Sequence, residues 1–316
     1  MEKGNYTPVT EFILLGFSDH PKLQTILFVV FLVIYVTTLL GNLGIILLIR
    51  LESRLHTPMY FFLSHLSFVD ICYTSSITPK LLSNIISEAR EISFLACAAQ
   101  MYLFVAFVVA ESFLLAVMAY DRYVAISNPL LYTAVMSKMR CINMIAGCYT
   151  WGHFCALVHT NFAFRHDFCG PNTIQHFFCD ISPVLDLSCS DTYISKRLLF
   201  VLATFVETST MTIIVMSYIF IIVCVSRIQT SKAKYKAIST CASHFTAFTI
   251  FHSTILFIYC QPTAASHSGD THRIASVFYT MVTPMLNPLI YSLRNKEVKS
   301  ALKRLMDRKG FFLVSI

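Results

Sequence analysis

The chain has 316 residues, of which 56% are hydrophobic and 13% are charged, and its formal net charge is +7. A soluble domain carries roughly 25% charged residues, so this composition excludes an ordinary water-soluble protein. The apolar residues also gather in long runs, and the runs 23–49 and 141–164 contain no Asp, Glu, Lys or Arg. Because a helix needs about 20 apolar residues to cross the hydrocarbon layer of a bilayer, these runs predict transmembrane helices.

Seven segments have the length and composition of membrane spans, in the order 23–49, 58–82, 93–121, 141–164, 197–226, 237–261 and 272–293. The connecting segments are short, except for 165–196. This organisation predicts an all-α membrane protein built as a seven-transmembrane helix bundle. It divides into an extracellular N-terminal segment over 1–22, a transmembrane domain over 23–293 and a cytoplasmic tail over 294–316.

The orientation of the bundle follows from its positive charges. With the N-terminus outside, 16 of the 24 Lys and Arg residues fall on the inner side, as the positive-inside rule requires. The net charge therefore reflects membrane topology and does not indicate nucleic-acid binding, and we expect a multi-pass protein of the plasma membrane. The acceptor pattern for N-glycosylation at Asn5 agrees with an outer N-terminus.

The tail beyond the seventh span has helical periodicity. Five apolar residues fall on one face of a helix, namely Val298, Ala301, Leu302, Leu305 and Met306. We expect a short amphipathic helix that lies along the inner leaflet, and a disordered basic tail is the alternative.

Four of the 11 cysteines lie at the outer side of the predicted bundle, where the environment is oxidising. These are Cys97, Cys169, Cys179 and Cys189. Four cysteines permit three pairings, and the sequence does not choose among them. Any pairing that uses Cys97 would tie the long loop to the third span and make the loop a lid over the bundle. His176 and Asp180 beside Cys179 are also metal-ligand types, but a disulfide-bonded cysteine is not a thiolate ligand, so we predict no metal site.

Ionisable residues inside a membrane span are costly and mark functional sites. Asp70, Glu111 and Glu207 fall inside spans, as do Asn42 and Asn287. We expect Asp70 and Glu111 to meet in the bundle centre, where two adjacent carboxylates need a cation or a shared proton. A bound Na⁺, one protonated acid, or a purely structural cluster would each be consistent with them. The direction of Glu207, towards the cavity or towards the membrane surface, stays open.

The sequence carries no pattern of an enzyme. We find no HExxH, no CxxC pair, no Gly-rich phosphate loop and no nucleophile with a neighbouring base. No catalytic residue and no cofactor are therefore predicted, apart from the possible Na⁺.

Six segments carry a resemblance to a known family. They are Gly41-Asn42, LHTPMYFFLS at 55–64, MAYDRYVAI at 118–126, Ser217-Tyr218, KAISTCASH at 236–244 and PMLNPLIYSLRNK at 284–296. The chain resembles the olfactory receptors, specifically the tetrapod-type class II subgroup of the rhodopsin-like class A G protein-coupled receptors. The segments extend from the first span to the tail, so the resemblance covers nearly the whole chain.

The resemblance implies disulfides Cys97–Cys179 and Cys169–Cys189. It implies that Arg122, in Asp121-Arg122-Tyr123, is the cytoplasmic switch residue. Tyr218 and Tyr291 are similar to the tyrosines that rearrange towards this arginine on activation. The resemblance also places Asp70, Glu111 and Asn287 around a sodium-type site.

The ligand cavity implied by the family lies in the outer half of spans three, five, six and seven. The residues that match its lining are mostly apolar, which suits a small apolar ligand with one or two polar anchors: Phe104, Val105, Val108, Val109, Ala203, Val206, His252, Ile255, Leu256, Tyr259 and Thr280. The sequence has Phe251-His252-Ser253 where the family usually has Phe-Tyr-Gly, at the floor of the pocket. We expect His252 to affect the choice of ligand or the response to pH.

The function implied is that of an odorant receptor. It would bind a small, mostly apolar volatile molecule and activate a heterotrimeric G protein of the stimulatory olfactory type, raising cyclic AMP. A transporter or proton channel that uses Asp70, Glu111 and Glu207 as a relay is an alternative, although transporters commonly have two related halves and no repeat is evident here. A class A receptor for an internal metabolite is a third reading.

Overall fold

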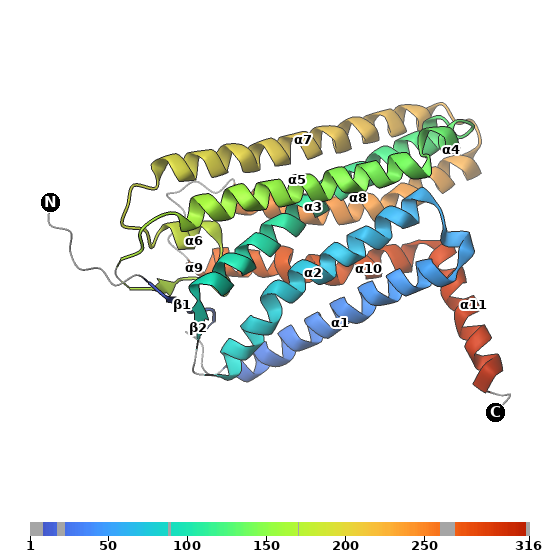
Figure 1. Ribbon diagram of the computed structural model, residues 1–316. Coiled ribbons are helices and arrows are strands. Elements are labelled where there is room, and N and C mark those ends of the chain that lie inside the picture. The colour runs from blue at the N-terminus through green and yellow to red at the C-terminus, as the bar shows by residue number, and fades with distance from the viewer. Residues whose placement is uncertain (1–8, 18–22, 88–89, 170, 260–268, 314–316) are drawn as a thin grey trace.

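The computed structural model describes residues 9–17, 23–87, 90–169, 171–259 and 269–313. Seven long helical columns lie side by side in this part of the chain (Figure 1), which confirms the predicted seven-helix bundle. Six of them are α1 (Gln24–Leu51), α2 (Pro58–Ile86), α3 (Phe94–Ser127), α5 (Lys138–Phe164), α7 (Tyr193–Ser226) and α8 (Ser231–Tyr259). The seventh consists of α9 (Gly269–Val277), the π-helix η4 (Phe278–Val282) and α10 (Thr283–Arg294). The shorter helices are η2 (Ser53–Leu55), α4 (Tyr132–Val135), α6 (Ile181–Leu185) and α11 (Lys296–Leu313).

The outer surface of the bundle is apolar. Large hydrophobic side chains are exposed along α1 and α7, among them Ile26, Val33, Leu40, Phe200 and Ile222. Such continuous exposure would promote association in water and fits a hydrocarbon surrounding. Five helical stretches in the described residues are long and apolar enough to cross a membrane: α1, α3, α5, α7 and residues 273–291.

The helices α2 and α8 do not reach that degree of hydrophobicity. The interior of α2 holds Asp70, Ser67, Thr74 and Thr78, all buried against neighbouring helices. The beginning of α8, by contrast, is polar, with lysines at 232, 234 and 236. A helix that is surrounded by other helices can carry polar side chains, because these find partners inside the protein and not in lipid.

The column α3 runs through the middle of the bundle and packs against α2, α5, α7 and α8. Its closest approach to α5 depends on Gly152. A β-carbon at Gly152 would overlap the backbone carbonyl oxygen of Ala106, which belongs to α3. Small residues permit such backbone contact between membrane helices, so Gly152 sets the distance between α3 and α5.

Two prolines shape the seventh column. Proline lacks an amide hydrogen, so Pro288 cannot bond the carbonyl of Pro284 and Pro284 cannot bond that of Thr280. Side chains of other helices meet both carbonyls: Asn42 Nδ2 in α1 donates to the Pro284 oxygen at 3.0 Å, and Thr74 Oγ1 in α2 donates to the Thr280 oxygen at 3.5 Å. The backbone groups freed by the prolines thus attach this column to α1 and α2.

A small sheet, which was not predicted from the sequence, closes one end of the bundle. Strand β1 (Glu11–Leu14) pairs antiparallel with β2 (Glu91–Ser93) and parallel with β3 (Thr173–Ile174). In β1, Phe12 and Leu14 are fully buried and Glu11 is exposed. This alternation is the strand pattern, although four residues are too few to predict a strand. We call this end of the bundle the sheet end (Figure 1).

The opposite end, which we call the tail end, carries α4 and α11 (Figure 1). The tail forms the predicted helix over Lys296–Leu313. The Tyr60 hydroxyl donates to Glu297 Oε2 at 2.8 Å, and Arg304 Nε lies 3.3 Å from Glu52 Oε2. Of the predicted apolar face, Val298 and Ala301 are buried within the protein, whereas Leu302 is 47% exposed.

The role of Gly152 gives a stability prediction with a control in the same helix. Gly152→Ala should lower the free energy of unfolding by about 1–3 kcal/mol, the usual cost of overpacking. A β-carbon at Gly147 would meet no atom within 4 Å, so Gly147→Ala should be neutral or stabilising by up to about 1 kcal/mol through helix propensity. Thermal unfolding of the detergent-solubilised protein measures both variants, and equal melting temperatures for the two would contradict the assignment.

Candidate functional site

The long loop between α5 and α7 covers the sheet end of the bundle. Disulfides join Cys97 to Cys179 and Cys169 to Cys189, the two bridges that the family resemblance implied. The first bridge ties the loop to the beginning of α3, and the Cys179 amide also donates to Gln100 Oε1 at 2.9 Å. The loop is therefore the lid expected from a pairing that uses Cys97.

The disulfide also bears on the metal-ligand residue types of this loop, because it involves Cys179. Cys179 is bonded to Cys97, so it is not a thiolate ligand. His176 Nε2 lies 3.2 Å from Ser276 Oγ, and Asp180 Oδ1 accepts from the Ile181 amide at 2.7 Å. No cluster of three metal-ligand side chains occurs among the residues that the structure describes.

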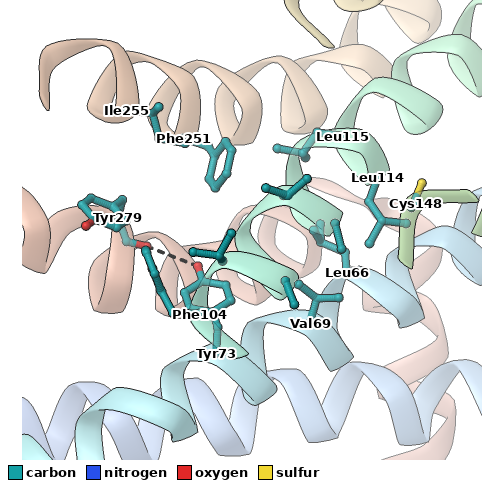
Figure 2. Close-up of a cluster of buried hydrophobic side chains, with 14 of the residues drawn as sticks. Leu66, Val69, Tyr73, Phe104, Leu114, Leu115, Cys148, Phe251, Ile255 and Tyr279 are labelled. Atoms are coloured by element: carbon teal, nitrogen blue, oxygen red, sulfur yellow. Dashed lines mark hydrogen bonds between the residues drawn. The ribbon is translucent and has the colours of Figure 1, made fainter. Parts of the chain in front are cut away.

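An aromatic cluster lies below the lid. The Phe104 ring in α3 lies 5.0 Å from the ring of Phe178 in the lid and 5.8 Å from the ring of Tyr279 in η4, measured between centroids. Figure 2 shows Phe251 of α8 pointing into the bundle, with Phe104 and Tyr279 beside Tyr73, and Ile255 of α8 is buried. Side chains of α3, α8, the seventh column and the lid thus meet in one apolar region.

The predicted ligand residues do not all share this region. Phe104, Val105, Val109, Val206, His252, Ile255 and Thr280 are buried, and Val108 and Ala203 are partly buried. Leu256, in contrast, is 36% exposed, on a different side of α8 from the buried Ile255. The side chain of Tyr259 and the whole of Asn5 lie outside the described residues.

Two aromatic residues of this region were not among the ligand residues predicted from the sequence. Phe178 and Tyr279 are buried and contact Phe104. Phe178 follows His176 and Phe177 directly before Cys179, and an aromatic pair beside a bridging cysteine was the available signal. Tyr279 carried no comparable signal, because its direction depends on the π-helix.

The ionisable residue Glu207 points towards α8. His252 Nδ1 lies 2.8 Å from Glu207 Oε1, and the side chains are 1% and 15% exposed respectively. The question that the sequence left open is therefore answered by a contact between α7 and α8.

A cavity of about 880 Å³ lies elsewhere, at the tail end between α1, α2 and α5. Its lining includes Arg50, Phe61, His65, Lys138 and Tyr149. None of the predicted ligand residues borders it, and it is separated from the aromatic cluster by the middle of the bundle. Its position gives it no part in the predicted ligand site.

Two carboxylates and an amide meet at the bundle centre. Asn287 Nδ2 lies 3.0 Å from Asp70 Oδ2 and 3.3 Å from Glu111 Oε1. Asp70 and Glu111 are fully buried, Asn287 is 3% exposed, and Glu111 Oε2 has no hydrogen-bond partner among the described residues. Asp70 and Glu111 thus lie together at the bundle centre, as predicted, and one amide group donates to both acids.

The tail end holds a second polar group around Asp121. Tyr132, in α4, donates its hydroxyl hydrogen to Asp121 Oδ1 at 2.7 Å, and Asp121 is 1% exposed. Burial is the main factor that raises the pKa of the Tyr132 hydroxyl above its usual range, with the Asp121 charge adding to it. Tyr132 therefore stays protonated and keeps α4 bonded to the end of α3.

The tyrosines expected to rearrange lie close to Arg122. His244 Nε2 in α8 lies 3.0 Å from the Leu115 carbonyl oxygen, which only accepts, so the Nε2 atom carries the proton. His244 Nδ1 then accepts from the Tyr218 hydroxyl in α7 at 2.8 Å. The Tyr291 hydroxyl is buried and has no hydrogen-bond partner among the described residues. Arg122 lies within electrostatic reach of Tyr218, His244 and Tyr291, and the Tyr123 ring lies 5.4 Å from that of Phe220 in α7.

Comparison with known proteins now decides the family. The family model described as "Olfactory receptor" matches residues 31–309. The chain belongs to the olfactory receptor family. It is 57% identical over 305 residues to human olfactory receptor 5D18, with 96% of this chain and 97% of the relative covered, and 54% identical over 309 residues to human olfactory receptor 5L2, with 98% and 99% covered.

The fold of this olfactory receptor is also that of solved membrane proteins. The crystal structure of squid rhodopsin superimposes with a TM-score of 0.72 at 19% identity, covering 90% of this chain and 80% of the other. The family consists of seven-helix receptors of the multi-pass membrane type and not of enzymes. The polar groups at the centre and tail end of the receptor are therefore candidates for signalling and not for catalysis.

Proposed function

We propose that this receptor binds a small, mostly apolar odorant below the lid and activates a stimulatory olfactory-type G protein, which raises cyclic AMP. The observation that carries the proposal is the pairing of two regions in one bundle: the apolar cluster at the sheet end and the group around Arg122 at the tail end. The six sequence motifs support the tetrapod-type class II subgroup.

The proposed orientation places the sheet end outside the cell. Both disulfides lie at that end, and disulfides persist in an oxidising environment. The excess of Lys and Arg lies towards the tail end, as expected for a cytoplasmic side. In this topology residues 1–22 are extracellular, 23–293 form the transmembrane domain, and 294–316 form the cytoplasmic tail of a plasma-membrane receptor.

The proposed ligand site uses the buried side chains of the predicted set together with Phe178 and Tyr279. Phe104, Val105, Val206 and Ile255 supply apolar contacts, which suit a ligand of low polarity. We leave out Leu256, because its exposed position on α8 points it away from this region.

The proposed mechanism is a shift between two arrangements of α7 and α8. An agonist raises the population of the active arrangement only as far as it binds that arrangement more tightly. In the resting arrangement the Tyr218–His244 bond holds α7 to α8. Separation of these helices at the tail end would release Tyr218 towards Arg122 and open a surface for the G protein, with Tyr291 as the second tyrosine that gains a partner.

The central acids fit a Na⁺ ion. Two fully buried carboxylates share one amide donor, and Glu111 Oε2 has no hydrogen-bond partner among the described residues. Carboxylate and amide oxygens are suitable ligands for a hard cation. Asp70 and Glu111 would hold the ion, whose charge would balance the two acids, and Asn287 borders the site with its Nδ2 bonds to both carboxylates.

The switch role of Arg122 is tested in cells that carry the receptor. A panel of volatile compounds is scored for cyclic AMP, and Arg122→Ala should abolish the agonist response while the receptor still reaches the cell surface. The matched control is Arg140→Ala, because Arg140 is an exposed arginine of the same end whose Nη1 bonds the Val135 carbonyl. Normal signalling by Arg122→Ala would refute the switch role.

The sodium site is tested by thermal unfolding of the purified receptor in NaCl and in choline chloride at equal ionic strength. Because an ion that binds only the folded state stabilises it by RT ln(1 + [Na⁺]/Kd), the melting temperature should be higher in sodium. Asp70→Asn should remove the difference, and Glu207→Gln, a change at a carboxylate outside the site, should keep it. Equal melting temperatures of the unmutated receptor in the two salts would favour a shared proton over an ion.

A further inference from the structure

The membrane-spanning parts of α7 and α8 are nearly free of charge. Glu207 is the one residue of the acidic or basic types in 198–226, and 237–269 contains no Asp, Glu, Lys or Arg. The structure brings Glu207 into contact with a histidine of the other helix, since His252 Nδ1 and Glu207 Oε1 are 2.8 Å apart. A carboxylate and an imidazole at this depth in the membrane are costly, so their contact indicates a functional site.

The carboxylate determines which nitrogen of His252 carries the proton. With Glu207 ionised, its carboxylate only accepts hydrogen bonds, and His252 Nδ1 is then the donor across their 2.8 Å contact. The second nitrogen, Nε2, is buried and has no hydrogen-bond partner among the described residues. A second proton on Nε2 would bury a charged N–H group without an acceptor, which costs more than a bare lone pair. Nε2 is therefore a buried hydrogen-bond acceptor to which a ligand could donate.

The surroundings of His252 belong to the proposed ligand site. Val206, directly before Glu207 in the chain, is buried, and so are Phe251 and Ile255 on α8. Phe251 points into the bundle (Figure 2). The Phe248 ring lies 6.1 Å from the His252 ring between centroids. An acceptor nitrogen thus lies among apolar side chains that offer a ligand little other polar contact.

We propose that His252, oriented by Glu207, is the polar anchor of the ligand site and selects small molecules that carry a hydroxyl group, such as alcohols and phenols. The hydroxyl donates to Nε2 while the rest of the ligand packs against the apolar side chains. A ketone, ester or ether of the same skeleton has no hydroxyl hydrogen to donate. The lone pairs of its oxygen would face the lone pair of Nε2, and the two would repel each other. Glu207 is a positioning residue, because it fixes the proton on Nδ1. The inference rests on the proposed function of the receptor.

The test uses sets of compounds that share one carbon skeleton: an alkane, its alcohol, the matching ketone and the methyl ether of the alcohol. Cyclic AMP responses and surface expression are measured in cells with the unmutated receptor and with three variants. His252→Phe removes the acceptor at similar size. Glu207→Gln keeps a hydrogen bond to Nδ1 but its amide can also donate, which permits the proton to move to Nε2. Ser253→Ala is the control, because Ser253 is exposed and its hydroxyl bonds the Ile250 carbonyl.

The unmutated receptor should respond to the alcohol at a concentration at least about tenfold lower than to the ketone or ether, the factor that one buried hydrogen bond typically supplies. His252→Phe should weaken the alcohol response about tenfold and leave the alkane response unchanged. Glu207→Gln should reduce the ratio of alcohol to ketone potency, a change that loss of packing alone would not produce. Ser253→Ala should match the unmutated receptor.

Two results overturn the inference in distinguishable ways. Equal potency of alcohol, ketone and ether at the unmutated receptor refutes the anchor and leaves the proposed receptor function intact, as does an alcohol preference that survives His252→Phe. Silence of the surface-expressed receptor towards every compound of the panel refutes the proposed function itself, and the anchor with it. The comparison of compounds at the unmutated receptor needs no variant, so a folding defect in His252→Phe does not remove the test.

Discussion

The alignment of the helices depends on one constraint: lipid offers no hydrogen-bond partner, so polar groups inside the bundle depend on partners within the protein, and several of them reach a partner on another helix. Asn42 of α1 meets the carbonyl that Pro288 leaves free, Asn287 of α10 reaches Asp70 and Glu111, and His244 of α8 bridges α3 and α7. Apolar packing alone would let the helices slide or rotate against one another, because apolar side chains pack similarly against lipid and against other helices. These few bonds set how the helices are aligned.

The same bonds explain how a ligand at one end could act at the other. The α7–α8 pair is joined near the lid side by Glu207–His252 and towards the tail end by Tyr218–His244, both at 2.8 Å. In the proposed mechanism, a ligand that engaged the first contact would change the spacing of the two helices, and the second contact would respond if the helices moved as rigid columns. The Tyr291 hydroxyl has no hydrogen-bond partner among the residues that the structure describes, and in the proposed mechanism it would gain one in the active arrangement.

Much of the fold was predictable from the sequence, because helices that cross lipid need long apolar segments. Mostly apolar runs of helix length predicted the seven columns, and the cost of buried carboxylates predicted that Asp70 and Glu111 meet. Details that depend on helix rotation were not predictable. Neighbouring residues on a helix point about 100° apart, which separates exposed Leu256 from buried Ile255, and the direction of Glu207 depended on the same angle. The three short strands had too few residues to give a periodic signal.

The constraint is tested most directly where a freed carbonyl has a single side-chain donor from another helix. Asn42→Leu keeps the approximate size of the side chain but removes its 3.0 Å bond to the Pro284 carbonyl. Leaving a buried acceptor unpaired costs about 1–3 kcal/mol, so thermal unfolding of the purified receptor should show a clear drop in Tm. Asn143→Leu, at an exposed position of α5, should cause none. A Tm for Asn42→Leu equal to or above that of the unmutated receptor would contradict the account.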